Sequence, residues 1–440
     1  MTAMLSFENA PPLSVPARFF ATAPIYGVLA GLLLLIEGGD LLLSRWTPAA
    51  LALTHLLTVG VLMQVMIGAL FQFLPVAADA GIARPRFAAA LVHGTLNLGA
   101  LLLSFGFYLS LPLLLKLAGV FLAVAVLSFV GFAFAALWRK RHTSPSIPAL
   151  KLALVGLTVT AGFGLHLLVV LAFGLAGRMG GLTAQHAAWG LIGWSATLIV
   201  GVAYVVVPMF QLTPAYPKRI SGALVPVLFV LLLVWALVQA IGSVIGIAVV
   251  GSTLALALGF FATLTLGLQG KSRRAEVDTT FLYWRLAMLS TLLATAIWAA
   301  LPWIEWLAPT VDTLPLVLAL GMLAIFGVLV AVISGMLYKI APFLCWLHLQ
   351  QFGMERGIYK TPHMGVFLAE RPMRVQFFWH NATLALLLAA LAVPGILTFA
   401  GVAMVGSFLL LGFNLVSALR VFGRERAKLA ASSGVTAGGG

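Results

Sequence analysis

The chain has 440 residues, of which 62% are hydrophobic and only 8% are charged. Soluble globular domains are about a quarter charged, so this composition excludes an ordinary soluble domain and indicates that lipid is the solvent of the whole chain. The formal net charge of +14 does not indicate nucleic-acid binding, because the Lys and Arg residues fall in short clusters between apolar runs. The single cysteine, Cys345, excludes an intramolecular disulfide and a CxxC motif.

Apolar stretches long enough to cross a bilayer as helices, which takes about 20 residues, follow one another along the chain. They lack strand alternation, so an all-α membrane protein is expected rather than a barrel. The N-terminus lacks the shape of a cleavable signal, so the first helix is expected to remain as an anchor. The twelve expected spans are 19–43, 51–76, 86–110, 112–138, 149–177, 183–210, 221–241, 243–269, 279–300, 312–340, 374–393 and 396–419.

Most connections between these spans are short, and three are longer. They are 139–148, 270–278 and 341–373, the last being a polar loop with a clear shift in composition. The tail, 421–440, ends in Gly and Ser and is expected to be disordered.

The positive charges predict the orientation. With twelve spans, both termini and the even-numbered loops share one side, and that side carries all but three of the 25 Lys and Arg residues. The exceptions are Arg45, Lys116 and Arg178. The positive-inside rule therefore predicts a multi-pass protein of the bacterial inner membrane, in contact with the lipid bilayer, with both termini in the cytoplasm.

An internal repeat is visible in the second, sixth and tenth spans. Each contains G-x7-G-x6-P, and the copies lie 133 and 134 residues apart: Gly60, Gly68 and Pro75; Gly193, Gly201 and Pro208; Gly327, Gly335 and Pro342. Glycines eight apart lie about 80° apart on one side of a helix, which permits close approach of another helix or a flat ligand. The proline is expected to close each span. The repeat predicts three tandem four-helix units, 1–140, 141–270 and 271–420, around a pseudo-threefold axis along the membrane normal.

Two local sequences within this pattern resemble a known superfamily. They are His55-Leu-Leu-Thr-Val-Gly with Gly68-Ala-Leu-Phe-Gln-Phe-Leu-Pro75, and His186-Ala-Ala-Trp-Gly-Leu-Ile-Gly-Trp194 with Val206-Val-Pro-Met-Phe210. With the twelve-helix arrangement, they resemble the catalytic subunit of heme–copper oxidases. The histidine inventory is similar to that of the non-oxidase branch, which includes NnrS-type heme- and copper-containing membrane proteins. The resemblance implies heme b, and copper, as cofactors.

Histidines inside the expected spans form two layers by depth. The outer layer holds Glu37, Asp40, His55, His166 and His186, and the inner layer holds His93 and His380. Ionisable residues inside a membrane span are costly and are functional by default, and imidazole suits copper, iron and zinc. We therefore expect His55 and His186 to hold a metal or heme, with His166, Glu37 and Asp40 nearby, and His93 with His380 to hold a second heme. The alternative is that each histidine simply bonds to a carbonyl of a neighbouring helix.

Several oxidase ligands that the resemblance would imply are absent. Gly190 stands where oxidases carry the tyrosine of His-x3-Tyr, and the seventh span has no histidine. In the tenth span, Met322 occupies the repeat position of His55, either as a thioether heme ligand or as a packing residue. Oxygen reduction by the usual binuclear centre is therefore not expected.

The favoured prediction is a heme- or copper-binding membrane protein for electron transfer, nitric oxide handling, or metal and heme supply. The glycine faces would admit the macrocycle, Glu37 or Asp40 would tune or hydrate the site, and a redox partner or respiratory subunit would dock. The alternatives are a cofactor-free transporter that uses buried His and Glu as a proton or metal-ion relay, and a structural partner of a respiratory subunit.

Overall fold

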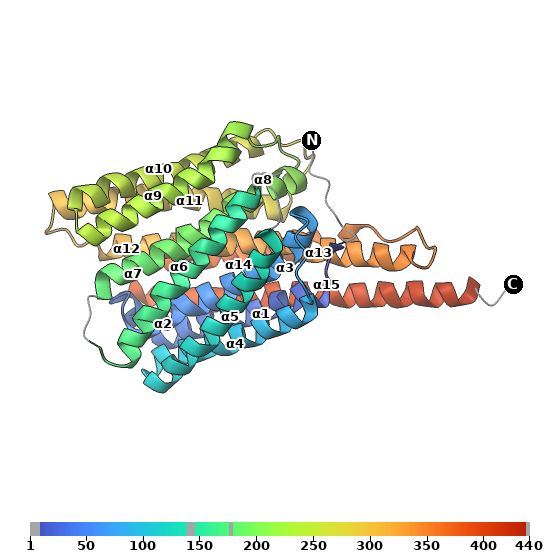
Figure 1. Ribbon diagram of the computed structural model, residues 1–440, viewed down its shortest axis with the longest axis horizontal. Helices are drawn as coiled ribbons and strands as arrows, with labels where there is room; N and C mark the ends of the chain where they lie inside the picture. Colours follow the sequence, from blue (N-terminus) through green and yellow to red (C-terminus); the bar gives the residue numbers. More distant parts are fainter. Residues whose placement is uncertain (1–8, 139–145, 176–178, 437–440) are drawn as a thin grey trace.

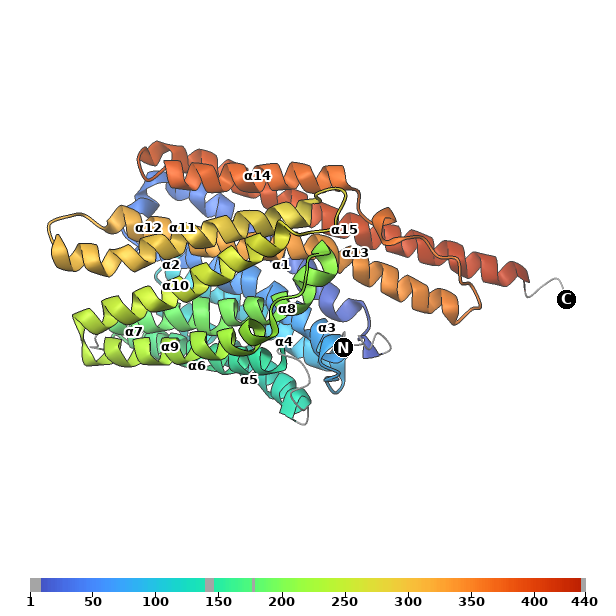
Figure 2. The ribbon, with the colours of Figure 1, turned by 90° about the horizontal axis from the view of Figure 1, so that it is seen from above.

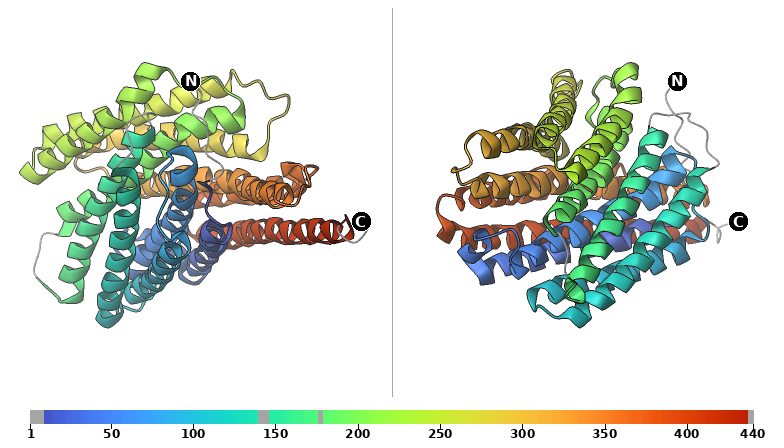
Figure 3. Two further views of the ribbon diagram at one scale, coloured as in Figure 1. Left: turned by 45° about the vertical axis from the view of Figure 1, so that its right-hand side comes forward. Right: turned by 60° about the vertical axis from the view of Figure 1, so that its left-hand side comes forward.

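The computed structural model describes residues 9–138, 146–175 and 179–436, and every regular element in these ranges is a helix. Long helices lie side by side in one bundle, and the final turns of α13 and α15 project together from one end (Figure 1, Figure 2). The left view of Figure 3 shows the same packing and the same projecting pair. Eleven of the spans formed by these helices are long and apolar enough to cross a membrane. The chain is therefore a multi-pass helical membrane protein.

The elements follow the predicted order. Residues 9–138 form α1 (Ser14–Glu37), η2 (Gly38–Leu42), α2 (Pro48–His55), η3 (Leu56–Met63), α3 (Gln64–Ala77), α4 (Pro85–Tyr108) and α5 (Pro112–Trp138). Next come α6 (Ser146–Ala172), α7 (Met179–Ala188), η4 (Trp189–Ala196), α8 (Thr197–Gln211), α9 (Lys218–Ile241) and α10 (Val244–Gln269). The remainder forms α11 (Thr279–Leu307), α12 (Leu314–Met322), η5 (Leu323–Val330), α13 (Ala331–Met354), η6 (Met364–Val366), α14 (Glu370–Ala389), η7 (Pro394–Ile396) and α15 (Leu397–Thr436). The expected connection 139–148 falls mostly outside the described residues.

The eleventh expected span, α14, is the one that is not among the eleven apolar candidates. Its 20 residues are enough to cross the hydrocarbon core of about 30 Å. However, it carries polar side chains that a lipid-facing helix avoids: Glu370, Arg371, Arg374, Gln376, His380 and Asn381. It packs against α11 and α15, so its buried polar side chains meet protein rather than lipid.

The three helices with the glycine motif share a second feature. Each changes from α to π geometry for eight residues, in η3, η4 and η5. Each π segment starts four residues before the first glycine of the motif, at Leu56, Trp189 and Leu323. Because π segments are rare and often functional, their recurrence at one motif position adds a structural feature to the repeated sequence motif.

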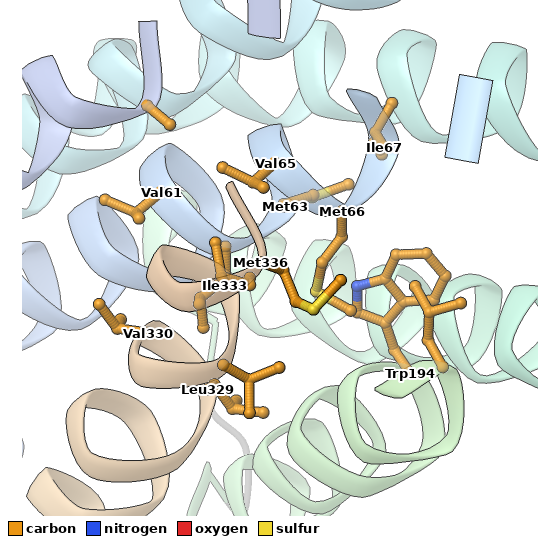
Figure 4. Close-up of a cluster of buried hydrophobic side chains, with 14 of the residues drawn as sticks. Val61, Met63, Val65, Met66, Ile67, Trp194, Leu329, Val330, Ile333 and Met336 are labelled. Atoms are coloured by element: carbon orange, nitrogen blue, oxygen red, sulfur yellow. The ribbon is translucent and has the colours of Figure 1, made fainter. Parts of the chain in front are cut away.

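The π segments also meet in space, since η5 contacts both η3 and η4. The core around this meeting point is apolar: Met66 of α3, Trp194 of η4 and Met336 of α13 lie together (Figure 4). The Trp284 indole N–H donates to Met336 Sδ at 3.2 Å. These soft side chains fill the irregular space that three bulged helices leave.

Two expectations about where helices end were wrong. Pro342 does not close its helix, because α13 continues to Met354, so the expected loop 341–373 shrinks to the segment between Met354 and Glu370. The tail expected to be disordered is helical up to Thr436. Both helices extend further than expected because they pack together in a second apolar cluster outside the main core. In this cluster, Cys345 and Leu349 of α13 pack against Phe367 and Ala418.

The projecting pair is long. The 40 residues of α15 span about 60 Å, roughly twice the thickness of the hydrocarbon core. Beyond the second apolar cluster, the ring of Phe352 lies under two guanidinium groups, Arg356 at 3.6 Å and Arg426 at 4.7 Å. Cation–π contacts of this kind help to keep the end of α15 against α13.

Candidate metal or heme site

The structure brings together His55 and His186, which are far apart in sequence. Their rings are nearly parallel, at 17°, and the ring centroids are 6.2 Å apart. That separation lies at the long end of the range of about 4.5–7 Å for offset-stacked rings. It also equals the span of two imidazoles that hold one metal ion from opposite sides, because two metal–nitrogen bonds of about 2.0–2.1 Å plus the two half-rings then sum to roughly 6 Å.

The hydrogen bonds of the two histidines leave the same nitrogen free on each ring. His55 Nδ1 lies 2.8 Å from the Leu51 carbonyl oxygen, and His186 Nδ1 lies 3.0 Å from the Thr160 carbonyl oxygen. A carbonyl only accepts, so each Nδ1 carries the proton and donates it. Each Nε2 therefore holds a lone pair, and a ring held in this way by its other N–H is typical of metal-ligating histidine.

Local structure positions both rings. The Thr47 side chain accepts from the Ala50 N–H and caps α2, with Pro48 in its first turn, so the helix that carries His55 starts at a fixed point. The His186 ring lies against Gly164 of α6, where an added Cβ would come within 2.9 Å of Cε1. Phe107 of α4 packs beside His55, with ring centroids 5.0 Å apart. Four helices, α2, α4, α6 and α7, thus surround the pair.

The other residues expected in the outer layer do not join the pair. His166 is exposed on α6, and Asp40 is exposed in η2. Glu37 is engaged elsewhere, because its Oε1 accepts from the Tyr108 hydroxyl at 2.8 Å. In the described ranges, no group of three or more His, Cys, Asp or Glu side chains is placed to hold a metal ion. The site that the protein offers consists of two imidazoles.

The expected inner pair, His93 and His380, is not a pair. His93 packs against α1, with its Nε2 3.2 Å from Thr22 Oγ1 and its ring edge-on to Phe19 at 5.0 Å. His380 packs against the Phe326 and Tyr283 rings. The two histidines have separate sets of neighbours, so a heme held between them does not fit.

Met322 and the glycine faces were expected to serve a macrocycle. Met322 immediately precedes η5, as His55 precedes η3, and it packs against the main core as a partly buried side chain. The glycine faces are filled by neighbouring helices: a Cβ added to Gly60 would come within 2.4 Å of the Tyr26 ring, and one added to Gly68 within 2.6 Å of Phe19. Of the two uses expected for the glycines, close helix packing is the one observed.

Sequence reasoning missed the residues that hold the two rings. Thr160 and Leu51 act through backbone carbonyls, which any residue type supplies, so no sequence signal marks them. Gly164 has a weak signal, because it is a glycine on the helix next to His186. A buried polar cluster around Tyr283 and Gln376 also escaped sequence reasoning.

Comparison with known proteins adds no identification: no protein-family model matches this sequence, and no curated protein matches it.

Proposed function

We propose that this chain is a heme- or copper-binding membrane protein whose site is His55 with His186. The observation that carries the proposal is the pair itself: two nearly parallel imidazoles, 6.2 Å apart, with both Nδ1 atoms committed to carbonyls. Packing alone does not explain why two histidines lie together with Nε2 free on both rings. Both residues lie within candidate membrane spans, where an ionisable group is functional by default.

The donor set fits some groups and not others. Two imidazoles would suit copper or a heme iron. They do not suit a structural zinc site, which takes four protein ligands. Of the two groups, copper needs less space, because the glycine faces are filled by neighbouring helices and the face at Gly164 is filled by the His186 ring itself. Either group would supply one-electron chemistry when bound.

The chain's own residues orient and insulate this site. The Leu51 and Thr160 carbonyls fix the ring tautomers, and hydrogen bonding of this kind also raises the basicity of the ligating nitrogen. Phe107 covers one side of the His55 ring and excludes water there. Tyr108, the next residue, holds Glu37, which keeps that carboxylate near the same end of the bundle without making it a ligand. With a bound group, such a site would serve electron transfer, nitric oxide handling or metal and heme supply. Oxygen reduction by a binuclear centre is not part of the proposal, because Gly190 stands at the tyrosine position and the seventh span has no histidine.

The proposal extends to ancestry and orientation. We infer three four-helix units related to the catalytic subunit of heme–copper oxidases, and the recurring π segments support the three-unit part of this inference. The location in a bacterial inner membrane, with cytoplasmic termini, rests on the Lys and Arg distribution. A redox partner or respiratory subunit would meet the protein in this membrane.

The test is an absorption spectrum combined with iron and copper analysis of the purified full-length protein. Wild type is expected to contain heme or copper, and His55→Ala and His186→Ala are each expected to lose it. His166→Ala is the matched control, because this histidine is exposed on the adjacent helix α6, and it should retain the cofactor. Wild-type protein without a Soret band, iron or copper would overturn the proposal, as would full retention in both single variants.

A second candidate, a cofactor-free transporter, is favoured by Gln64 and Gln72. Both side chains are buried on α3, and neither amide has a hydrogen-bond partner. Burying an unpaired amide costs about 1–3 kcal/mol or more, so water or a passing solute would have to satisfy it. Solute uptake into proteoliposomes by metal-free protein, abolished in Gln64→Leu, would support this candidate over the first.

A further inference from the structure

A chain of buried polar side chains runs through α11, α13, α14 and α15. Its members are at most 2% exposed: Tyr283, Tyr338, Gln376, Ser407 and Asn414. The hydroxyls of Tyr283 and Tyr338 both donate to Gln376 Oε1, at 2.5 and 3.0 Å, and Gln376 Nε2 donates to Ser407 Oγ at 2.9 Å. Asn414 Nδ2 donates to the Tyr338 hydroxyl at 3.0 Å. In a membrane-spanning bundle, buried polar groups need partners, and a satisfied network of this size either fixes the packing of its helices or serves a function.

One end of this polar network lies where α14 begins, at an end of the helix bundle that is rich in charged residues. Asn414 Nδ2 lies 3.3 Å from the Pro372 carbonyl in the first turn of α14. There, Glu370 Oε1 accepts from the Thr279 N–H and hydroxyl, and Arg374 forms an ion pair with Glu370. The network of polar groups therefore ends two residues from Glu370 and Arg374 along α14, beside this charged surface.

The other end is His380. It lies four residues after Gln376 on α14, and it is 1% exposed. Its Nε2 has no hydrogen-bond partner. It is ten residues beyond Glu370, about 15 Å along the helix, which is near the middle of the hydrocarbon core.

Packing alone does not require the two tyrosines. A Cβ on Gly68 would come within 2.6 Å of Phe19, and a Cβ on Gly335 would come within 2.5 Å of Tyr283, so Phe19 and Tyr283 fill the same position of the repeated motif. Phe71 and Tyr338 likewise stand three residues after these glycines. The Phe19 and Phe71 rings fill this space without hydroxyl groups, so in Tyr283 and Tyr338 the hydroxyls have another purpose.

We propose that this polar chain is a proton-access path from the charged end of the bundle and that His380 is the site it serves. The neutral His380 ring accepts one proton at Nε2 from a water molecule admitted along the path, and it returns that proton by the same path. The Gln376 amide does not titrate; it orders the two phenols that line the path. The charge that His380 gains is stabilised by the face of Phe326, whose ring is stacked on it with centroids 4.3 Å apart and an angle of 12°.

The groups around His380 allow this assignment. The titratable side chains of the packed helices near it are Tyr283 on α11, with its ring edge-on at 5.1 Å, and Tyr338 on α13. Asp278, Lys339 and Arg374 stand at the charged end, where Asp278 forms an ion pair with Lys339 at 2.7 Å. No carboxylate contacts the His380 ring in the part of the chain that the structure describes, so a proton on His380 is not trapped by a salt bridge.

The test is deuterium exchange at the histidine C2 carbon, followed by mass spectrometry of the full-length protein in nanodiscs between pH 5 and 9. This exchange requires water at the ring and depends on its protonation. We expect His380 to exchange with a sigmoidal pH dependence, despite its burial. The double variant Tyr283→Phe/Tyr338→Phe should slow His380 about tenfold, the order of effect of losing ordered hydrogen bonds, and leave His166 unchanged.

Folding of the double variant is checked by unchanged exchange at His93 and His166. If it does not fold, Tyr338→Phe alone is used, because Asn414 keeps the Pro372 carbonyl as a partner. No exchange at His380 while exposed His166 exchanges would overturn the proposal, as would the same His380 rate in the tyrosine variants and in wild type. Because the experiment needs no cofactor, its failure is distinct from failure of the His55–His186 proposal.

Discussion

Two regions of the bundle use the same packing scheme with different polarity. Around Gly68, the side chains are Phe19 and Phe71, and His93 lies edge-on to Phe19. Around Gly335, tyrosines replace both phenylalanines, and His380 lies edge-on to Tyr283. We call these the Gly68 region and the Gly335 region.

The difference lies in where each histidine finds a partner. In the Gly68 region, His93 Nε2 has the Thr22 hydroxyl, and the aromatic pair beside it is apolar. In the Gly335 region, the polar groups bond to one another through Gln376, and His380 Nε2 has no partner. The comparison teaches that glycines and aromatic rings set how the helices pack in both regions. The polar groups determine whether the histidine has a hydrogen-bond partner or is left free to take up a proton.

Replacement of Gln376 should give the largest effect on stability. Gln376→Leu removes the acceptor of two phenol groups and the donor to Ser407, so the free energy of unfolding in detergent should fall by roughly 2–4 kcal/mol. The control is Asn97→Leu on α4, one turn beyond His93, because the Tyr26 hydroxyl can keep the Asn97 backbone carbonyl as its acceptor at 3.0 Å. An equal loss in both variants would show that the Gln376 network is not special.

Glycine substitutions should affect the two regions alike. Gly68→Ala and Gly335→Ala each push a methyl group against an aromatic Cβ, at 2.6 and 2.5 Å. Overpacking of this kind costs about 1–3 kcal/mol in unfolding free energy. Gly94→Ala is the control, since nothing lies within 4 Å of the added Cβ, and it should be neutral or stabilising by up to about 1 kcal/mol. Clearly unequal losses for Gly68 and Gly335 would break the packing equivalence.

Exchanging the aromatic residues should be asymmetric. Phe71→Tyr adds a hydroxyl to a ring that is 1% exposed and packs against other phenylalanines, and it should cost about 1–3 kcal/mol. Tyr338→Phe removes one of two donors to Gln376, so thermal or chemical unfolding should show a loss of only about 0.5–1.5 kcal/mol. If Tyr338→Phe were the more damaging change, the hydroxyl would be there for stability rather than for access to His380.

The smallest effect is expected at Thr22. Thr22→Val removes the hydroxyl partner of His93 but nearly preserves the shape of the side chain, and the loss should be about 1 kcal/mol or less. Deuterium exchange at C2 of His93 in this variant then reports whether loss of the hydrogen-bond partner of Nε2 is enough to make a buried histidine exchange. Exchange as fast as at His380 would mean that the tyrosine network is unnecessary.

Much of the fold could be predicted because apolar length is a strong signal. Each of the twelve expected spans has a helical counterpart, and even the polar α14 (Glu370–Ala389) overlaps the expected 374–393. The end at Pro342 could not be predicted, because proline is tolerated in a membrane helix when neighbouring helices pack against it. Here Cys345 and Leu349 pack against the Phe367 and Ala418 side chains, and such long-range contacts cannot be read from the local sequence.

The candidate site was predicted in part. Depth along the spans was enough to place His55 and His186 in one layer, and the structure brings them together. Depth says nothing of the side of a helix on which a residue lies, so it did not reveal that His166 is exposed or that Glu37 bonds to Tyr108. The polar network escaped notice because tyrosines in an apolar chain resemble packing residues, although a comparison with Phe71 at the repeat position carried the signal.

The central claim, that His55 and His186 together hold a heme or copper ion, is tested most directly by metal analysis with an absorption spectrum. Full-length protein is purified as wild type and as the His55→Ala, His186→Ala and His166→Ala variants. We predict bound heme or copper in wild type and His166→Ala, and its loss in the other two. Protein free of heme, iron and copper in all four preparations, or equal cofactor content in all four, would contradict it.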